Sequence, residues 1–291
     1  MTNSYFSKSN LSSLSSTARE EQRFPIGVFD SGVGGLTVLR EIYRKLPQES
    51  ILYFGVTARL PYGNRSGEEI LQFVREIITW MTQQGVKMVI MACNTSSALA
   101  LEQVQSEFDV PILGLILPGA RGAVQKGKRI GIISTPATAK SNAYGKAIQE
   151  IKPHIPVWQI GCPEFVPLIE QNRLYDSYTY EVAKKYLTPL MEANIDTLIY
   201  GCTHYRHIAH IFKEILPSFV EFVDPAIYVV KAAEKELEAM ELKNTLNPFP
   251  TRFCVSGSPE QFAKLSQQWL GYKPTVEKVD LSIFSTKFSV T

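Results

Sequence analysis

The sequence predicts an α/β protein made of two similar parallel-sheet domains, with a site at their interface. Short apolar runs alternate with stretches of helical period along most of the 291 residues, which is typical of parallel sheets covered by helices. The half after residue 115 also repeats the order of elements of the first half, although no sequence repeat can be aligned. Finally, two cysteines, Cys93 and Cys202, occupy matching places in the two halves.

Each element follows from its local pattern. Apolar runs predict buried strands, apolar residues three and four apart predict helices, and Gly or Pro separates them. We predict strands at 26–29, 51–54, 86–92, 111–116, 129–133, 156–160 and 197–200. We predict helices at 36–46, 68–84, 96–108 and 139–151, and further helices up to residue 192. Residues 1–23 are polar and begin with a Ser-rich stretch, which predicts a disordered tail without a secretory signal.

Composition excludes several classes of function. A net charge of +2 with scattered Lys and Arg gives no reason to expect a nucleic acid or an anionic membrane as partner. No apolar run reaches the roughly 18 residues that span a bilayer. Four cysteines without a CxxC pair indicate neither a disulfide framework nor a metal site. We therefore expect a reduced, cytoplasmic setting and no metal.

The two matching cysteines are the main candidates for chemistry. Cys93 and Cys202 each end an apolar run and precede a turn and a predicted helix. A helix N-terminus can stabilise a thiolate at such a position. A small buried hydrophobe is the alternative for either cysteine alone, and a cysteine hydrolase would leave the second thiol unexplained. We interpret Cys162 and Cys254, which lack this setting, as structural.

Other polar groups follow strand ends. Asp30 and Ser31 precede a GxGG sequence, which lacks the GxGxxG spacing of a dinucleotide loop. They are better interpreted as groups aimed into a pocket, for instance at an amine, with a turn or cap as the alternative for Asp30. Thr135 and Thr138 can bind a carboxylate or cap the following helix. The segment 61–64 by itself is typical of a turn.

Two thiols in one pocket suit a specific reaction. A carbon flanked by two bases can lose a proton on one face and regain one on the other, which inverts its configuration. Cysteine suits this work because its unperturbed pKa of about 8.5 lies close to neutral. Backbone N–H groups and hydroxyls at strand ends can stabilise the charge that develops on a carboxylate. No lysine stands out for pyridoxal phosphate, which favours a cofactor-free route.

Four sequence blocks resemble the signature blocks of the glutamate racemases, which are cofactor-independent enzymes of the aspartate/glutamate racemase superfamily. The blocks begin at Asp30 (DSGVGG), Pro61 (PYG), Ala92 (ACNT) and Gly201 (GCTHY). The resemblance runs from about residue 24 to residue 271, and includes a C-terminal strand and helix at 253–270. It implies that the protein racemises an amino acid without a cofactor.

The resemblance also implies a role for each matching residue. Cys93 would act on the α-proton of D-glutamate and Cys202 on that of L-glutamate. Asp30 and His204 would assist the first and second thiol respectively, and Glu170 would lie near the second. The residues that would contact the substrate are Ser31, Tyr62, Gly63, Asn94, Thr95, Thr135, Thr138 and Thr203.

The implied organisation is two α/β domains with the active site between them. The first would comprise residues 24–115 plus 228–280, and the second residues 116–227. The implied partner is glutamate, and the implied role is to supply D-glutamate for peptidoglycan, and so for cell wall and cell shape, in a bacterial cytoplasm. The sequence leaves the oligomeric state open, with a homodimer as one alternative.

Two residues depart from the family pattern. Val56 stands where the family commonly has Asp, so that acid is not assigned. Arg206 stands where the family usually has Pro, and it either favours the Cys202 thiolate or points to solvent. Two alternatives therefore stay open: a racemase of aspartate or another amino acid, and a weakly active homologue that acts by binding a partner protein.

Overall fold

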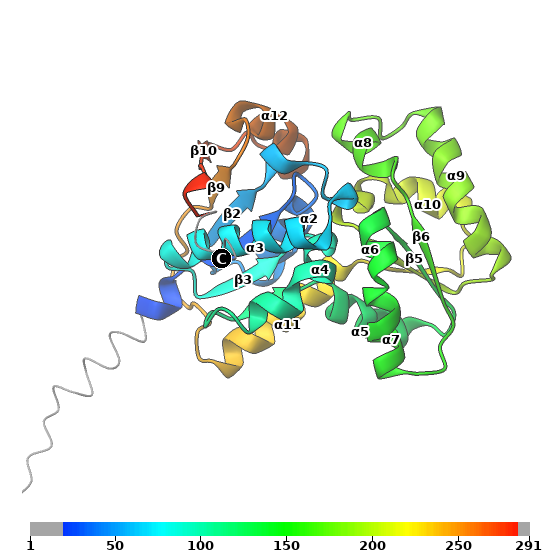
Figure 1. Cartoon of the computed structure of the whole chain (residues 1–291), viewed down its shortest axis with the longest axis horizontal. Coiled ribbons are helices and arrows are strands. Elements are labelled where there is room, and N and C mark those ends of the chain that lie inside the picture. The colour runs from blue at the N-terminus through cyan, green and yellow to red at the C-terminus, as the bar shows by residue number, and fades with distance from the viewer. Residues whose placement is uncertain (1–19, 285–291) are drawn as a thin grey trace, which may run out of the picture.

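The computed structural model describes residues 20–284 and contains two parallel sheets that form two lobes side by side (Figure 1). The first sheet has the strand order β10-β9-β2-β1-β3-β4 and the second β6-β5-β7-β8. Every strand pair is parallel, and helices cover both sheets. The predicted α/β class with two parallel sheets is confirmed.

The first sheet takes strands from both ends of the described chain. Its strands are β1 (Ile26–Asp30), β2 (Ile51–Gly55), β3 (Met88–Met91), β4 (Ile112–Gly114), β9 (Arg252–Val255) and β10 (Val276–Lys278). The strands of the second sheet are β5 (Ile130–Ser134), β6 (Val157–Gly161), β7 (Thr197–Gly201) and β8 (Glu221–Val223). The chain thus leaves the first sheet after β4, builds the second, and returns to the first at β9.

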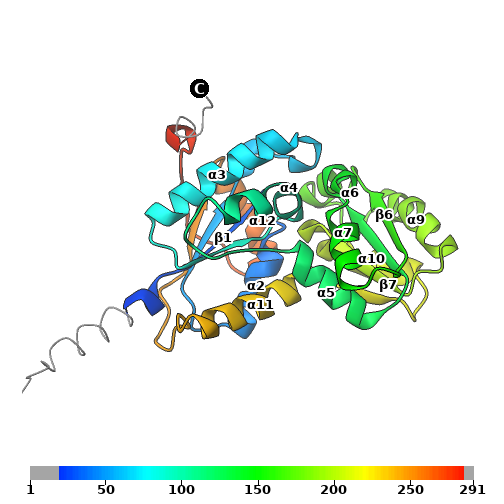
Figure 2. The ribbon, with the colours of Figure 1, turned by 60° about the horizontal axis from the view of Figure 1, so that its bottom comes forward.

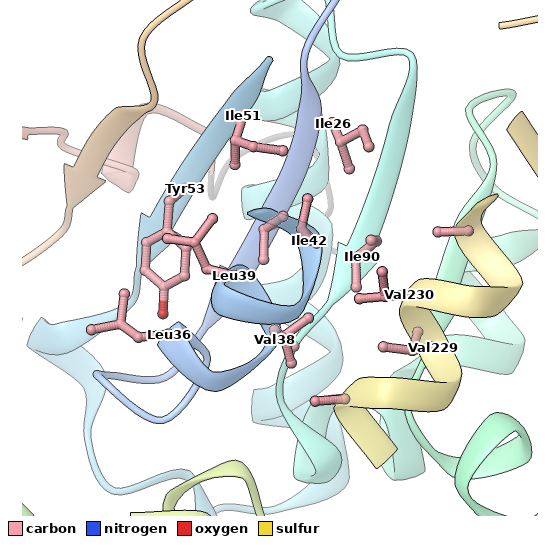
Figure 3. Close-up of a cluster of buried hydrophobic side chains, with 14 of the residues drawn as sticks. Ile26, Leu36, Val38, Leu39, Ile42, Ile51, Tyr53, Ile90, Val229 and Val230 are labelled. Carbon is pink, nitrogen blue, oxygen red and sulfur yellow. The ribbon is translucent and has the colours of Figure 1, made fainter. Parts of the chain in front are cut away.

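Helices bury both faces of the first sheet. On one face lie α2 (Leu36–Lys45), α11 (Pro225–Ala239) and α12 (Pro259–Leu270), and on the other lie α3 (Gly67–Gln83) and α4 (Asn94–Gln105). Figure 3 shows how the α2 and α11 side chains meet those of β1, β2 and β3. Each large aliphatic side chain buried there contributes about 1.5–3 kcal/mol. These contacts fix the strand ends from which the site is built.

The second sheet is covered in the same way. The helices α5 (Ile116–Lys126) and α7 (Ala143–Ile151) pack on one face, and α8 (Phe165–Glu170), α9 (Ser177–Glu192) and α10 (Ala209–Ile215) pack on the other. The short helix α6 (Pro136–Ser141) packs against α4 and against the 3₁₀ helix η2 (Tyr62–Asn64) of the first lobe. A second 3₁₀ helix of that lobe, η1 (Thr57–Arg59), follows β2. Figure 2 shows α5 beside α11 where the lobes join.

Side-chain caps define where several helices begin. Ser66 and Glu69 form a reciprocal capping box at the start of α3, with N–H···O distances of 3.2 and 3.0 Å. Thr135, Asp176 and Ser258 cap α6, α9 and α12. These caps satisfy backbone N–H groups that a helix start otherwise leaves unpaired.

The structure corrects several element predictions. The predicted helix at 139–151 is two helices, because Asn142 adopts the left-handed conformation with φ of 55° and ends α6. The helix predicted from Ser96 begins two residues earlier, directly after Cys93. The strand predicted at 111–116 is only β4, and α5 follows it at once. After Cys202 comes η3 (Thr203–Ile208), a 3₁₀ helix, where we predicted an ordinary helix.

The prediction of a disordered tail over residues 1–23 is wrong for its last four residues. Residues 20–23 form a helical turn, and the Gln22 carbonyl accepts a hydrogen bond of 2.6 Å from the buried Lys87 ammonium group. Residues 1–19 of the predicted tail lie outside the described residues. Between residues 20 and 284, no helix has the length and apolar character required to cross a membrane.

Candidate active site

The strand ends of the two sheets face one cavity between the lobes. Both matching cysteines line it, one from each lobe. The other predicted site residues that line it are Asp30, Ser31, Tyr62, Gly63, Asn94, Thr95, Thr135, Thr203 and His204. Thr138 and Glu170 are not in the lining, but each is hydrogen-bonded to a residue that is. The structure therefore brings every predicted site residue to one place.

Cys93 lies shortly after β3 and is the N-cap residue of α4. Its side chain is buried, with 5% exposure. Burial raises the pKa of the Cys93 thiol to about 12, and the negative charge of Asp30 adds to this shift. The backbone N–H and hydroxyl of Ser96 oppose it, as expected of groups at a helix start. We expected the helix N-terminus to favour the thiolate. Desolvation outweighs that effect at Cys93, so the net shift of its pKa is upward.

Cys202 lies in a different electrostatic neighbourhood. Its Sγ is 3.8 Å from His204 Nδ1, and His204 Nε2 is 2.7 Å from Glu170 Oε1. Burial opposes the charged imidazolium, but hydrogen bonds to Cys202 and Glu170 raise the pKa of His204 well above its usual value. Burial likewise opposes the charge on Glu170, and the bond to His204 outweighs it and lowers the pKa of that carboxyl group. The second thiol therefore sits beside a cation, whereas the first does not.

Asp30 is fully buried at the end of β1. Its Oδ2 accepts hydrogen bonds from the backbone N–H groups of Gly32 and Gly35, at 3.1 and 2.8 Å. Its Oδ1 has no hydrogen-bond partner among the described residues. Burial raises the pKa of Asp30, although the charge of His204 and the backbone N–H groups lower it. Asp30 is thus both a turn-stabilising residue and an unpaired acceptor in the cavity wall.

The first turn of α4 supplies a cluster of donors. Thr95 Oγ1 is 2.9 Å from Thr135 Oγ1 and 3.2 Å from Thr138 Oγ1, and those two oxygens are 3.0 Å apart. This hydroxyl triad joins α4 of the first lobe to α6 of the second. Asn94 and Thr95 also occupy the first turn of α4, where backbone N–H groups are free to bind an anion.

Glycines allow the lobes to approach closely. A Cβ atom at Gly34 would overlap His204 Nδ1 and would lie 2.6 Å from Thr203 Oγ1. A Cβ atom at Gly63 would lie 2.9 Å from Thr135 Cβ. Real Cβ atoms do not approach that closely, so only glycine fits where these loops meet the second lobe.

Sequence reasoning missed three features of the site. Ser96 faces Cys93 with its backbone N–H and hydroxyl, and it was not among the predicted site residues. Tyr144 reaches from α7 and donates a hydrogen bond of 2.6 Å to Asn94 Oδ1. Cys162, which we interpreted as structural, lines the cavity at the end of β6. Its place after a predicted strand was a signal for this, whereas no local pattern marked Tyr144.

Neither of the two departures from the family pattern lines the cavity. Arg206 Nε is 3.4 Å from Asp224 Oδ2, and the Arg206 side chain is half exposed. Its charge is therefore directed toward Asp224 at the start of α11. Val56 is fully buried in an apolar cluster with Phe54 and Tyr62, and it does not line the cavity. Neither residue occupies the place of a base.

Comparison with known proteins agrees with this geometry. A family model described as Asp/Glu/Hydantoin racemase matches residues 26–233. A glutamate racemase of Gloeothece citriformis is 71% identical over 91% of this chain and 95% of that protein. A solved glutamate racemase isoform of Bacillus anthracis has a TM-score of 0.86 at 39% identity, over 89% of this chain and 98% of that one.

A second solved structure adds a bound ligand. The glutamate racemase of Francisella tularensis, solved in complex with D-glutamate, has a TM-score of 0.85 at 36% identity, over 90% of this chain and 99% of that one. The arrangement of two parallel sheets is thus shared with solved racemases. The chain belongs to the Asp/Glu/Hydantoin racemase family and is an enzyme of the racemase class. The resemblance inferred from its sequence blocks is confirmed.

Proposed function

We propose that this protein is a glutamate racemase that moves the α-proton between Cys93 and Cys202 without a cofactor. The observation that carries the proposal is the placement of two buried thiols, one from each lobe, in the wall of one cavity. Their neighbourhoods differ, since burial and Asp30 favour the protonated thiol at Cys93 and His204 supplies a cation beside Cys202. One thiol is thereby suited to donate a proton while the other accepts one.

The reaction from the L-enantiomer follows from this asymmetry. The Cys202 thiolate takes the α-proton, and the electron pair left on Cα is delocalised into the neighbouring carboxylate. The Cys93 thiol then delivers its proton to the opposite face of Cα. The enzyme is left with a Cys202 thiol and a Cys93 thiolate, which is the state that accepts the D-enantiomer. A proton exchange with solvent or with Asp30 and His204 resets the pair.

The remaining residues bind and polarise the substrate. The backbone N–H groups at the start of α4, the Asn94 amide and the hydroxyls of Thr95 and Thr203 are the donors for carboxylate oxygens. Such preorganised donors stabilise the charge that develops during proton abstraction. The unpaired Oδ1 of Asp30 is the acceptor for the α-ammonium group.

We further propose that the two lobes correspond to domains at 24–115 plus 228–280 and at 116–227. The protein would supply D-glutamate for peptidoglycan in a bacterial cytoplasm, which is the role that a glutamate racemase of this family implies. Support for glutamate over aspartate comes from the high identity of the glutamate racemases to this chain over most of its length.

The direct test is circular dichroism of L-glutamate incubated with the enzyme and no added cofactor. We expect the optical signal to decay to zero, and we expect L-aspartate to keep its signal over the same time. Decay with aspartate alone would reassign the substrate. Stable signals from both amino acids would refute the racemase proposal and favour a binding role.

The two thiols are tested separately. Cys93→Ser and Cys202→Ser should each lower kcat/KM by about 10²–10⁴-fold, the contribution typical of one acid or base. Because the two enantiomers are equal in free energy, each variant must lose kcat/KM equally in both directions. Cys254→Ser is the matched control, since Cys254 is buried in β9 and does not line the cavity. Near-normal turnover by either thiol variant would exclude that thiol as a base.

A further inference from the structure

The two polar atoms of the Asn94 amide differ in their hydrogen bonding, since one has a partner and the other does not. It is the first residue of α4, lines the cavity and is only 2% exposed. Its Oδ1 accepts a hydrogen bond of 2.6 Å from the Tyr144 hydroxyl. Its Nδ2 has no partner among the described residues. A buried donor without an acceptor is costly, so it is a natural site for an acceptor on a ligand.

We propose that Tyr144 is a positioning residue that fixes the orientation of the Asn94 amide, so that Nδ2 faces a carboxylate of the substrate. This inference rests on the proposed function, because it assumes a substrate with a carboxylate in this cavity. It extends that function by assigning a role to a residue of α7 that does not line the cavity.

The orientation matters because the two ends of an amide have opposite polarity and nearly the same shape. With Oδ1 turned toward the cavity, Asn94 would present a second acceptor to an anionic substrate beside the two thiols. With Nδ2 turned toward the cavity, it presents a donor. The side-chain shape alone does not choose between these two states, so a neighbouring group must do so.

Tyr144 determines the orientation of the Asn94 amide because its hydroxyl carries a single hydrogen, which needs an acceptor. Burial raises the pKa of the Tyr144 phenol well above its usual value, so the hydroxyl stays protonated. Within residues 20–284 its hydroxyl has Asn94 Oδ1 as its hydrogen-bond partner. If the amide were turned around, Nδ2 would donate to the hydroxyl, and the phenolic hydrogen would have no acceptor. The observed orientation gives the phenolic hydrogen its acceptor.

Packing fixes the Tyr144 ring. The ring is fully buried in a cluster with Ile116, Ala120 and Ile148, between α5 and α7. Even a Cβ atom at Gly119 would lie only 3.2 Å from Tyr144 Cε1. A ring held this closely cannot move its hydroxyl to follow another amide orientation. The Asn94 Nδ2 donor is thereby oriented before the substrate binds. A donor that needs no reorientation stabilises developing charge most effectively.

The bond also crosses between the lobes. Asn94 and Thr95 belong to the first lobe, and their partners Tyr144 and Thr138 belong to the second. The two residues that begin α4 are therefore both held by the α6–α7 segment. The Asn94 donor is correctly oriented only when the lobes have this relative position.

A double-mutant cycle tests the proposal. Asn94→Ala should lower kcat/KM for glutamate by about 10²–10³-fold, as for loss of one preorganised donor. Tyr144→Phe, which removes only the hydroxyl, should lower it by about tenfold. If Tyr144 acts through Asn94, the double variant should be no worse than Asn94→Ala. Losses that multiply, or a Tyr144→Phe variant with wild-type kinetics, would overturn the proposal.

Asn94→Asp provides a second test that leaves Tyr144 unchanged. The introduced carboxylate would still accept the Tyr144 hydroxyl but cannot donate to the substrate, so KM should rise more than in Asn94→Ala. A wild-type KM would show that no donor is needed there. Tyr186→Phe is the control for removing a buried tyrosine hydroxyl elsewhere in the second lobe. Its kinetics should be unchanged.

The two proposals fail in different ways. If the wild-type enzyme leaves glutamate unracemised, the proposed function fails before the cycle begins. If the wild type racemises glutamate and the two losses multiply, only the positioning role of Tyr144 fails. Melting curves of all variants establish that each is folded at the assay temperature.

Discussion

His204 bridges Glu170 and Cys202, with Nε2 2.7 Å from the Glu170 carboxylate and Nδ1 3.8 Å from the Cys202 sulfur. Glu170 ends α8, Cys202 directly follows β7 and His204 lies in η3, where its imidazole is nearly inaccessible to solvent. Among residues 20–284, the charged group beside Cys93 is the carboxyl group of Asp30 and not a cation. The two thiols therefore have neighbours of opposite charge.

Glu170→Gln tests the bridge. The Glu170 carboxylate helps to raise the pKa of His204, so its loss should let the imidazolium deprotonate at lower pH. We expect kcat/KM to fall by about 10–100-fold, within the range of acid–base contributions. We also expect the alkaline limb of its pH profile to move to lower pH, as measured by circular dichroism. Glu181→Gln, an exposed change on α9, is the control and should leave the profile in place.

Asp30→Asn should separate stability from activity. Burial raises the pKa of Asp30, so the folded state binds this proton more tightly than the unfolded state. The stabilisation from that proton is complete below the unfolded pKa and is lost as pH rises through the folded pKa. Asn carries no such charge and can still accept from Gly32 and Gly35.

The measurement is a series of melting temperatures from pH 4 to pH 8 (roughly the window above the usual Asp pKa of about 3.9). The Asp30→Asn variant should gain stability relative to the wild type as pH rises, while its racemase activity falls. Asp109→Asn, at an exposed position, is the control for the same chemical change outside the cavity, and it should leave the activity unchanged. A difference that shrank with rising pH would contradict the raised pKa of Asp30.

Gly34→Ala should impair activity by separating the lobes at the Cys202 side. The added methyl group would overlap His204 Nδ1, so His204 or the loop must shift. We expect a fall in kcat/KM of at least about 100-fold, because small displacements of catalytic groups are this costly. Gly67→Ala is a matched control, since no heavy atom of the described part of the chain lies within 4 Å of its added Cβ. Equal kinetics for the two variants would refute this interpretation of Gly34.

Val56→Asp tests whether the departure from the family pattern limits the rate. Val56 is the N-cap residue of η1 and lies outside the cavity lining. An Asp there can cap η1, which stabilises the fold by about 1 kcal/mol. Burial of its carboxylate opposes this gain because the charge must lose its hydration. We expect a rise in kcat of no more than about threefold. A larger gain would mean that the introduced carboxylate takes part in the reaction, which the apolar side chain of Val56 cannot do.

The order of elements could be predicted from the sequence because it rests on local patterns. Apolar runs and helical periods predicted the strands of both sheets up to β7, and the matching strand ends predicted that Cys93 and Cys202 face one pocket. The break at Asn142 was missed, because an asparagine in a helical pattern does not by itself indicate a left-handed residue. The tight η3 turn after Cys202 was missed for a similar reason, since three- and four-residue periods are hard to tell apart in short segments.

The sequence by itself determined the α/β class, the paired thiols and, through its motif blocks, the family. These depend on residues that are close in the chain or on patterns that recur in it. Only the tertiary structure decided the surroundings of the two thiols, because burial raises the pKa of Cys93 and the bridge from Glu170 places a cation beside Cys202. It also brought Tyr144 to Asn94, since desolvation and contacts between lobes exist only once the chain has folded.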